Sequence, residues 1–422
     1  MPAYDRSRTE PDRPEAIVVG AGLAGLACAR RLAEAGRRVV VLEAGDGVGG
    51  RVRSDRVDGF TLDRGFQVAL TSYPELAAQL DLEALELRRF DPGALVFTGR
   101  RCWRVGDPLR RPGDALASAL APIGTPADKA RLALLLLRLR RTDPRTLLRQ
   151  PDRTTAAAIE ALGFTSLLTE RFLRPLFGGI QLDPALTTSS RMFSVVLRAL
   201  ATGYGAVPAA GMGAIPAQLA TALPAGTVRL GRRVLAVEPG AARTAGGDRL
   251  EARYVVVATD GPVAAGLLGL PPVASRPATS VWFAAAAPPV AGRRIVLDGT
   301  GAGPAHNVAV LSNVAPEYAP SGHTLVVAAC PGAARPDVAP DVQAQLRRWW
   351  GPAVDGWRHL RTDVVDHAQP GSSPPFSPRR PVALGEGLFV CGDHRDTPSI
   401  QGALFSGRRC ADAVLAALAA SA

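Results

Sequence analysis

Lysine, aromatic residues and long apolar runs are scarce in this chain of 422 residues. Lys129 is the only lysine, and aromatic residues make up 5% of the sequence. No apolar run reaches the roughly 18 residues that a transmembrane helix needs, so we expect no such helix. Residues 1–15 are polar and charged, which predicts a disordered lead-in without a signal peptide. We therefore expect a cytoplasmic protein.

Cysteines are also few, and their spacing matches no known framework. They form no C-x-x-C pair and no cluster with histidine, so neither a disulfide framework nor a metal site is predicted. Their positions are Cys28, Cys102, Cys330, Cys391 and Cys410.

The formal charge of +11 is carried almost entirely by arginine. No arginine-rich block carries interleaved aromatic residues, which argues against nucleic-acid binding. Residues 127–141 are predicted to form a helix in which Arg131 and Arg138 share a face. Such a helix could make peripheral contact with a membrane, or it could be a core helix with one solvated stripe.

The stretch from residue 16 to residue 43 reads as strand, glycine-rich turn, helix and strand. Its turn carries Gly20, Gly22 and Gly25 in the pattern G-x-G-x-x-G. These glycines permit a tight turn, close approach of a pyrophosphate, and close packing of helix on strand. Glu43 ends the second strand, where an acid can bind the hydroxyls of a ribose. The stretch predicts dinucleotide binding.

Similar turns recur along the chain. Gly49-Gly50-Arg51 allows a tight bend with a guanidinium that can reach an anion, and residues 60–70 alternate like a strand around Gly65. A buried strand over 254–258 ends at Thr259. Near the end, a strand over 387–391 is followed by Gly392-Asp393 and by a helix from Ser399 to Ala420.

Between these segments the character changes. Residues 73–90 are predicted to be helical, and 154–200 are predicted to be helical with a break at Gly178-Gly179. Residues 279–330 contain several β-rich runs. We expect two inserted stretches to form one substrate domain, with the second supplying most of its sheet.

This constellation resembles the flavoprotein superfamily of amine oxidases, protoporphyrinogen oxidase and phytoene desaturases. The residues that carry the resemblance are the G-x-G-x-x-G turn, Glu43, Gly49-Gly50-Arg51, Gly392-Asp393 and the run from Pro398 to Ala403. The resemblance implies FAD as cofactor. It also implies an α/β fold in which a Rossmann-like FAD-binding domain (16–69, 205–267 and 381–422) carries an inserted α+β substrate domain (70–204 and 268–380).

In such families the first motif and Glu43 hold the ADP half of FAD, Arg51 meets the phosphates, and the last helix points at the flavin. We therefore predict cofactor-binding residues at Gly20, Gly22, Leu23, Ala24, Gly25, Glu43, Ala44, Gly49, Gly50, Arg51, Gly65, Phe66, Gln67, Val234, Ala258, Thr259, Gly392, Asp393, Ser399, Ile400, Gln401 and Ala403. His394 follows the Gly-Asp turn and is the candidate catalytic residue.

Three departures from the amine oxidases bear on function. Lys129 does not lie on the strand where those enzymes keep a lysine near flavin N5, and Pro398-Ser399 replaces their tyrosine. Covalent members attach flavin through a cysteine that residues 366–380 lack, so FAD should be non-covalent. The segment 172–181 looks most like the protoporphyrinogen oxidase and desaturase side.

The predicted function is therefore FAD-dependent dehydrogenation of a mid-sized, largely apolar small molecule by hydride transfer to flavin N5. O2 or a quinone would be the electron acceptor. An amine or amino-acid oxidase, a redox-neutral flavin-dependent isomerase, and a flavin- or NAD-binding module without turnover remain alternatives.

Overall fold

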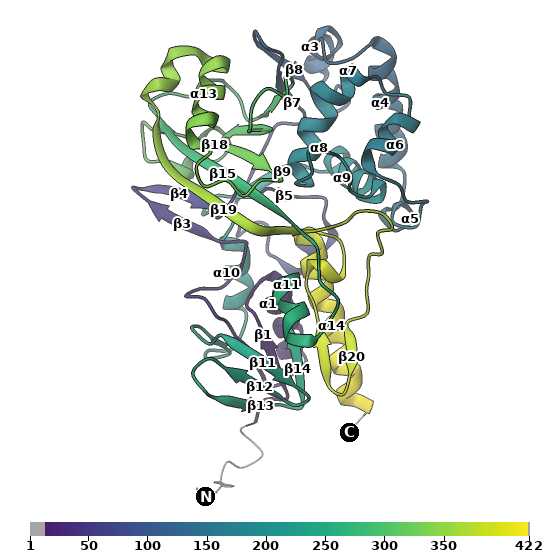
Figure 1. Ribbon diagram of the computed structural model, residues 1–422, viewed down its shortest axis with the longest axis vertical. Helices are drawn as coiled ribbons and strands as arrows, with labels where there is room; N and C mark the ends of the chain where they lie inside the picture. Colours follow the sequence, from purple (N-terminus) through teal and green to yellow (C-terminus); the bar gives the residue numbers. More distant parts are fainter. Residues whose placement is uncertain (1–12, 421–422) are drawn as a thin grey trace, which may run out of the picture.

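The computed structural model describes residues 13–420. A six-stranded sheet in the order β10-β2-β1-β14-β21-β20 forms the narrow lower part of the molecule (Figure 1). Neighbouring strands are parallel except β20, which is antiparallel to β21. Its central strands β1 (Ala16–Val19), β2 (Val39–Leu42) and β14 (Tyr254–Val257) are continuous apolar runs and fully buried, as parallel strands usually are. The other strands are β21 (Leu388–Val390) and, at the partly exposed edges, β10 (Val228–Arg229) and β20 (Ala383–Gly385).

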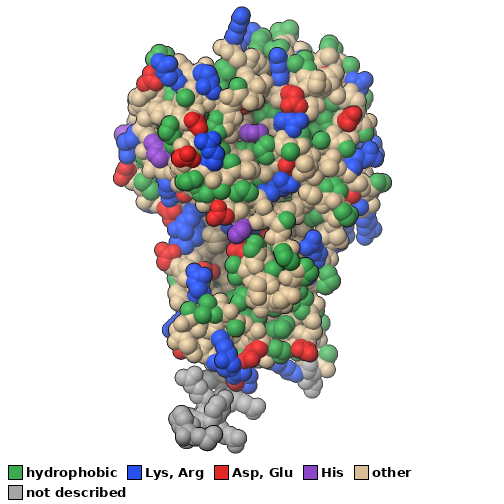
Figure 2. Space-filling view, viewed as in Figure 1, with side chains coloured by type: hydrophobic (Ala, Val, Ile, Leu, Met, Phe, Trp, Pro, Cys, Tyr) green, Lys and Arg blue, Asp and Glu red, His purple; other side chains and the backbone are tan. Residues whose placement is uncertain are grey.

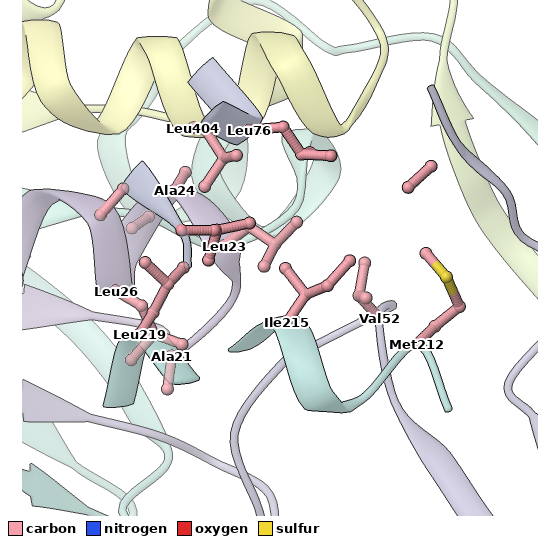
Figure 3. Close-up of a cluster of buried hydrophobic side chains, with 14 of the residues drawn as sticks. Ala21, Leu23, Ala24, Leu26, Val52, Leu76, Met212, Ile215, Leu219 and Leu404 are labelled. Carbon is pink, nitrogen blue, oxygen red and sulfur yellow. The ribbon is translucent and has the colours of Figure 1, made fainter. Parts of the chain in front are cut away.

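Helix α1 (Leu23–Glu34) packs against one face of this sheet, between α14 (Ile400–Ala420) and α10 (Ala214–Thr221). Figure 3 shows the core where these helices meet, with Leu23, Leu404 and Ile215 converging. A Cβ atom at Gly407 of α14 would lie 2.2 Å from a backbone oxygen of α1, so glycine is needed for this contact. A meander of β11 (Val234–Glu238), β12 (Ala241–Thr244) and β13 (Arg249–Glu251), and helix α11 (Gly261–Leu268), pack on the other face.

A second, seven-stranded sheet lies in the wider upper part, and its order is β19-β15-β18-β17-β16-β7-β8. All of its neighbours are antiparallel except β16 and β7. Helix α13 (Ala339–Trp350) covers one face. The strands are β7 (Ala94–Phe97), β8 (Cys102–Val105), β15 (Ser275–Ala285), β16 (Ile295–Asp298), β17 (Asn307–Val310), β18 (Thr324–Pro331) and β19 (Arg358–Pro370).

Helices fill the other side of the upper part (Figure 1). They enclose an apolar core that includes Phe177 and Phe193. Asp128 fixes two helix starts, because its carboxylate accepts hydrogen bonds from Thr125 and Thr165. The segments are α3 (Ala115–Leu120), α4 (Pro126–Arg140), α5 (Pro144–Leu147), α6 (Thr155–Ala161), α7 (Ser166–Leu168), η3 (Thr169–Leu173), α8 (Arg174–Ile180) and α9 (Ser190–Thr202).

Smaller elements join the two parts. Strands β5 (Ala69–Leu70), β9 (Gly205–Pro208) and β6 (Leu87–Arg89) form one antiparallel sheet. Both predicted domains contribute strands to this sheet. The division of the chain into these two domains stays a prediction.

A hairpin of β3 (Ser54–Val57) and β4 (Phe60–Asp63) ends at a buried carboxylate. Asp63 accepts hydrogen bonds from Ser54 Oγ (2.5 Å), Met212 N (2.9 Å) and Tyr318 Oη (3.1 Å). Burial raises the pKa of Asp63 to about 6, although these hydrogen bonds act in the opposite direction. The carboxylate therefore ties the hairpin to two distant segments.

Two local predictions were wrong. Residues 73–90 contain only the short helix α2 (Pro74–Gln79), because β6 pairs instead with β9, a partner far away in sequence. Helix α8 runs through Gly178-Gly179 without a break. Residues 1–12 of the predicted disordered lead-in lie outside the described residues, but residues 13–15 are held in place. Glu15 accepts a hydrogen bond from Arg38 N at 3.0 Å, and its carbonyl accepts from Tyr254 N.

Candidate functional site

One cavity of about 730 Å³ extends from the first glycine-rich turn into the upper helices. Most of the predicted cofactor residues line it, although they come from distant parts of the chain. They are Gly20, Gly22, Leu23, Glu43, Ala44, Gly49, Gly50, Arg51, Gly65, Phe66, Gln67, Val234, Ala258, Thr259, Asp393, Ser399, Ile400 and Ala403. The lining does not include Ala24, Gly25, Gly392, Gln401 or His394.

The first turn has the geometry that its glycines predict. Gly20 has φ +106°, a conformation that side chains disfavour. A Cβ atom at Gly25 would lie 2.0 Å from the oxygen of Gly20, so helix and strand could not approach as they do. A Cβ atom at Gly22, in contrast, would have no other atom within 4 Å. The space beside Gly22 is open, and no side chain caps the N-terminus of α1 there. Free N–H groups at a helix N-terminus suit a phosphate.

Glu43 lies at the end of β2, beside that turn. Its Oε2 accepts a hydrogen bond from Ala21 N and its Oε1 accepts one from Gly45 N, both at 2.7 Å. These bonds hold the carboxylate in one orientation on the cavity wall. Each carboxylate oxygen keeps a further acceptor position, which a ribose hydroxyl could use.

Arg51 and Asp393 meet across the cavity from opposite ends of the chain. Arg51 Nη2 donates to Asp393 Oδ1 at 2.7 Å, and its Nη1 donates to Ala368 O at 2.8 Å. The ion pair links the second glycine turn to the segment after β21. The turn that carries Arg51 lies beside Gly22, since Gly22 and Gly49 form a β-bridge.

The N-terminus of α14 also faces the cavity. Ser399 Oγ accepts from Gly402 N at 3.1 Å, and Ser399, Ile400 and Ala403 line the cavity. Gln401 instead turns its side chain toward α2, where its Oε1 accepts from Glu75 N at 2.9 Å. A direct cofactor contact by the Gln401 side chain therefore has no support in this geometry.

His394 is buried behind the cavity wall. Its ring packs against Gly392, where a Cβ atom would lie 2.5 Å from the ring. Burial lowers the pKa of His394 to about 4, so the ring is neutral near pH 7. Because it does not line the cavity, its position argues against proton transfer to a bound molecule, and its catalytic role stays an untested prediction.

The far end of the cavity is apolar. Its wall includes side chains from η3, α4, α8 and α9, namely Phe172, Leu132, Leu136, Leu176, Ile180, Met192, Val196, Leu197 and Leu200. Polar side chains that the sequence did not single out for the site also line the cavity, among them Tyr73, Gln181, Ser280, Asn307 and Gln369 and the charged Asp91, Asp107, Arg110 and Asp260. Ser280 Oγ accepts from Phe66 N at 2.9 Å and so joins β15 to the Gly65 loop. No local pattern marks these residues, because the long-range fold brings them together.

Comparison with known proteins agrees with this arrangement. A family model described as flavin containing amine oxidoreductase matches residues 23–415. The chain belongs to this family. Membership of this family implies that the cofactor is a flavin.

Similarity to individual proteins is of two kinds. Putrescine oxidase from Kocuria rosea is 48% identical over 84 residues, which is 20% of this chain and 18% of that protein. Phytoene desaturase from Cercospora nicotianae is 34% identical over 90 residues, 20% of this chain and 14% of that protein. The matches thus span less than a fifth of either relative. A putative protoporphyrinogen oxidase from Exiguobacterium sp. 255-15 shares the fold with a TM-score of 0.72 at 18% identity, covering 94% of this chain and 98% of that one.

Within residues 13–420, no helix combines the length and apolar character needed to cross a bilayer. The same residues contain no cluster of His, Cys, Asp and Glu side chains that could hold a metal ion. Three buried cysteines, Cys28, Cys391 and Cys410, lie together between α1, β21 and α14. They pack in the core and do not line the cavity.

Proposed function

We propose that this family member holds FAD non-covalently and dehydrogenates a mid-sized, largely apolar small molecule, with O2 or a quinone as electron acceptor. The observation that carries the proposal is the continuity of the cavity, which joins an anion-binding turn to an apolar chamber. When bound, FAD accepts a hydride at N5. The chain has the parts to hold it, since the lining residues fit its phosphates, ribose and ring in turn.

In this proposal one end of the cavity binds the cofactor and the other end binds the substrate. The N–H groups of α1 and Arg51 bind the pyrophosphate, and Glu43 binds the ribose. The N-terminus of α14 places fixed donors where negative charge develops on reduction. The leucine-rich wall binds the substrate and excludes water, and apolar burial stabilises the complex by about 25 cal/mol per Å².

The carboxylates of the cavity favour a neutral substrate over a cationic amine. Asp91 pairs with Arg111 at 2.7 Å, Asp107 pairs with Arg140, and Asp393 pairs with Arg51. Glu43 accepts two backbone N–H groups. Asp260 caps α11 by accepting from Val263 N at 2.9 Å. An ammonium group entering this cavity would have to compete with those partners.

Two experiments test the function. Acid precipitation should leave yellow FAD in the supernatant, whereas a yellow pellet would show covalent attachment. Anaerobic mixing with apolar candidates should bleach the flavin, while putrescine should bleach it slowly or not at all. Turnover of simple amines at about 1 per second or more would instead favour the amine oxidase alternative. Product formation without net bleaching or oxidant use would favour the isomerase.

A peripheral contact with an anionic membrane is part of the proposal. The solvent face of α4 exposes Leu134 (66%) and Leu137 (39%) next to the exposed Arg131, Arg138 and Arg141. Helix α3 exposes two more leucines nearby, Leu116 and Leu120. Basic side chains also lie along the right-hand edge of the upper part in Figure 2, on the side where Figure 1 places α4 to α6. Leucines between arginines suit the surface of an anionic bilayer.

The same helix connects that surface to the cavity. The opposite side of α4 supplies Leu132 and Leu136 to the cavity wall. A membrane-dissolved substrate would therefore pass one helix on its way to the site.

A further inference from the structure

One cation near the leucine-rich wall of the cavity has no counter-charge. The charged residues that line the cavity in this region are Asp91, Asp107 and Arg110. Asp91 pairs with Arg111 at 2.7 Å, and Asp107 pairs with Arg140. Within residues 13–420, in contrast, no carboxylate oxygen lies within 4.0 Å of the Arg110 guanidinium. Arg110 is only partly exposed, so an anionic group on a bound molecule would supply the counter-charge that the protein does not.

The guanidinium of Arg110 is held in place by neutral groups. Its Nη1 donates to Leu200 O at 3.0 Å and to Gly203 O at 2.8 Å, at the C-terminal end of α9. A helix C-terminus favours a cation, but these carbonyls carry no net charge. Both hydrogen bonds use Nη1, which leaves Nε and Nη2 for other acceptors. A fixed guanidinium fork of this kind suits the two oxygens of a carboxylate.

Tyr204 lies between Arg110 and a second arginine, Arg89 of β6. The Cζ atoms of Arg110 and Arg89 lie 4.1 and 5.1 Å from the centroid of the Tyr204 ring. Gly203 and Tyr204 line both the main cavity and a smaller pocket of about 490 Å³, whose wall includes Arg89. Tyr204 therefore lies where the main cavity meets this outer pocket.

The surroundings of the Tyr204 hydroxyl are positively charged. Hydrogen bonding and charge from Arg110, together with the charges of Arg89 and Arg111, lower the pKa of Tyr204. A group whose pKa falls for this reason has an environment that stabilises negative charge. An oxyanion beside the hydroxyl would thus be attracted by all three guanidinium groups.

The outer pocket is less suited to an anion than the main cavity. Glu83 and Glu86 line it. Glu86 pairs with Arg88 at 2.9 Å, but no cation of the described chain lies within 4.0 Å of the Glu83 carboxylate. Glu83 would repel an anion from the outer pocket. The anion should therefore rest on the inner side of Tyr204, at Arg110.

We propose that Arg110, assisted by Arg89 and Tyr204, forms a subsite for the carboxylate of a substrate that is otherwise apolar. Arg110 donates to the carboxylate oxygens, and the Tyr204 hydroxyl can donate to one of them. The apolar part of the substrate extends along Leu200, whose carbonyl anchors Arg110 and which itself lines the cavity. This inference deepens the proposed function and rests on it. It keeps a largely apolar substrate and adds one anionic end.

Two isomeric probes that differ in charge test the subsite: dodecanoate and methyl undecanoate. Their dissociation constants are measured by calorimetry on the FAD-loaded wild type and variants, and the ratio of the two constants is compared between proteins. The wild type should bind dodecanoate at least tenfold more tightly than the ester. Arg110→Gln should reduce this preference about tenfold. Arg89→Gln should reduce it about threefold, because Arg89 is exposed and its charge is better screened.

Arg101→Gln is the matched control. Arg101 is also an exposed arginine over an aromatic ring, with its Cζ 3.7 Å from the ring centroid of Trp103, but neither residue lines the cavity. Its removal lowers the net charge by the same amount, and the ratio should stay within twofold of the wild type.

Inorganic phosphate tests whether the site takes any oxyanion. It should bind at least 100-fold more weakly than dodecanoate, because it gains nothing from the apolar wall. Equally tight binding of phosphate would overturn the assignment to a substrate carboxylate.

Equal affinity of the wild type for both probes, or no binding of dodecanoate, would overturn the subsite and leave the proposed function intact. The same holds for an unchanged ratio in Arg110→Gln with flavin bound. If Arg110→Gln does not fold, an unchanged ratio in Arg89→Gln decides against the subsite. Failure of the wild type to bind FAD would overturn both this inference and the proposed function.

Discussion

Replacement of Gly22 by alanine should separate cofactor binding from folding. Gly22 has φ −71° and ψ 176°, which any residue adopts. A Cβ atom there meets no protein atom within 4 Å. Alanine is less favourable than glycine at a helix N-cap, and this is the only cost that we expect. The free energy of unfolding should therefore fall by less than about 1 kcal/mol.

The same methyl group would occupy the space that we assign to the pyrophosphate. A hydrogen bond from a backbone N–H group to a charged oxygen contributes about 1.5–3 kcal/mol. Displacing the phosphate from one such donor, at about 2 kcal/mol, weakens FAD binding about 30-fold. Gly25→Ala should behave in the opposite way and lose the fold, because its Cβ atom would lie 2.0 Å from the oxygen of Gly20.

The assay is titration of apoprotein with FAD, followed by the change in flavin fluorescence, with thermal unfolding measured in parallel. Gly266→Ala is the matched control, since its Cβ atom also meets nothing within 4 Å and Gly266 does not line the cavity. It should bind FAD like the wild type. A folded Gly22→Ala protein with an FAD dissociation constant within twofold of the wild type would refute the placement of the pyrophosphate.

Three further predictions follow from the same structure. Glu43→Ala should weaken FAD binding more than it lowers the unfolding temperature, and full FAD occupancy in that variant would exclude Glu43 as ribose ligand. Asp63 has a folded pKa of about 6, above the value of about 4 in the unfolded chain, so its contribution to stability is greatest below pH 4. It should fall by about 3 kcal/mol as pH rises to 7, and urea unfolding of wild type and Asp63→Asn should show diverging rather than parallel pH profiles. Replacing both Leu134 and Leu137 by serine should reduce binding to anionic vesicles at least tenfold, whereas Leu235→Ser, 62% exposed on β11, should not.

The secondary structure around the glycine-rich turns could be predicted because its signals are local. The expected strand, turn, helix and strand correspond to β1, α1 and β2, since glycines fix the turn and apolar runs fix the strands. The same holds for α14, whose start follows a Gly-Asp turn. Arg51 and Asp393 were each expected near the cofactor, but their ion pair was not, because nothing in either local pattern refers to the other.

The apolar end of the cavity could not be predicted, because long-range pairing brings its residues together. Residues 87–89 form a strand because β9 lies beside them, although the local pattern suggested a helix. Gln181 and Asn307 look like ordinary polar residues in the sequence. Only the packing of α8 against β17 buries both of them on one cavity wall.

The contrast between glycines fixed by backbone contacts and exchangeable leucines explains how the fold persists at low sequence identity. The chain shares a TM-score of 0.72 with a structure that is only 18% identical. A Cβ atom at Gly25 or Gly407 would collide with backbone, so these positions admit little change. Volume-conserving exchanges among the leucines of the wall cost less than about 1.5 kcal/mol each. We therefore expect substitutions in α4 and α9 to alter substrate preference before they alter flavin binding, and the apolar wall of the cavity to set the specificity of this chain.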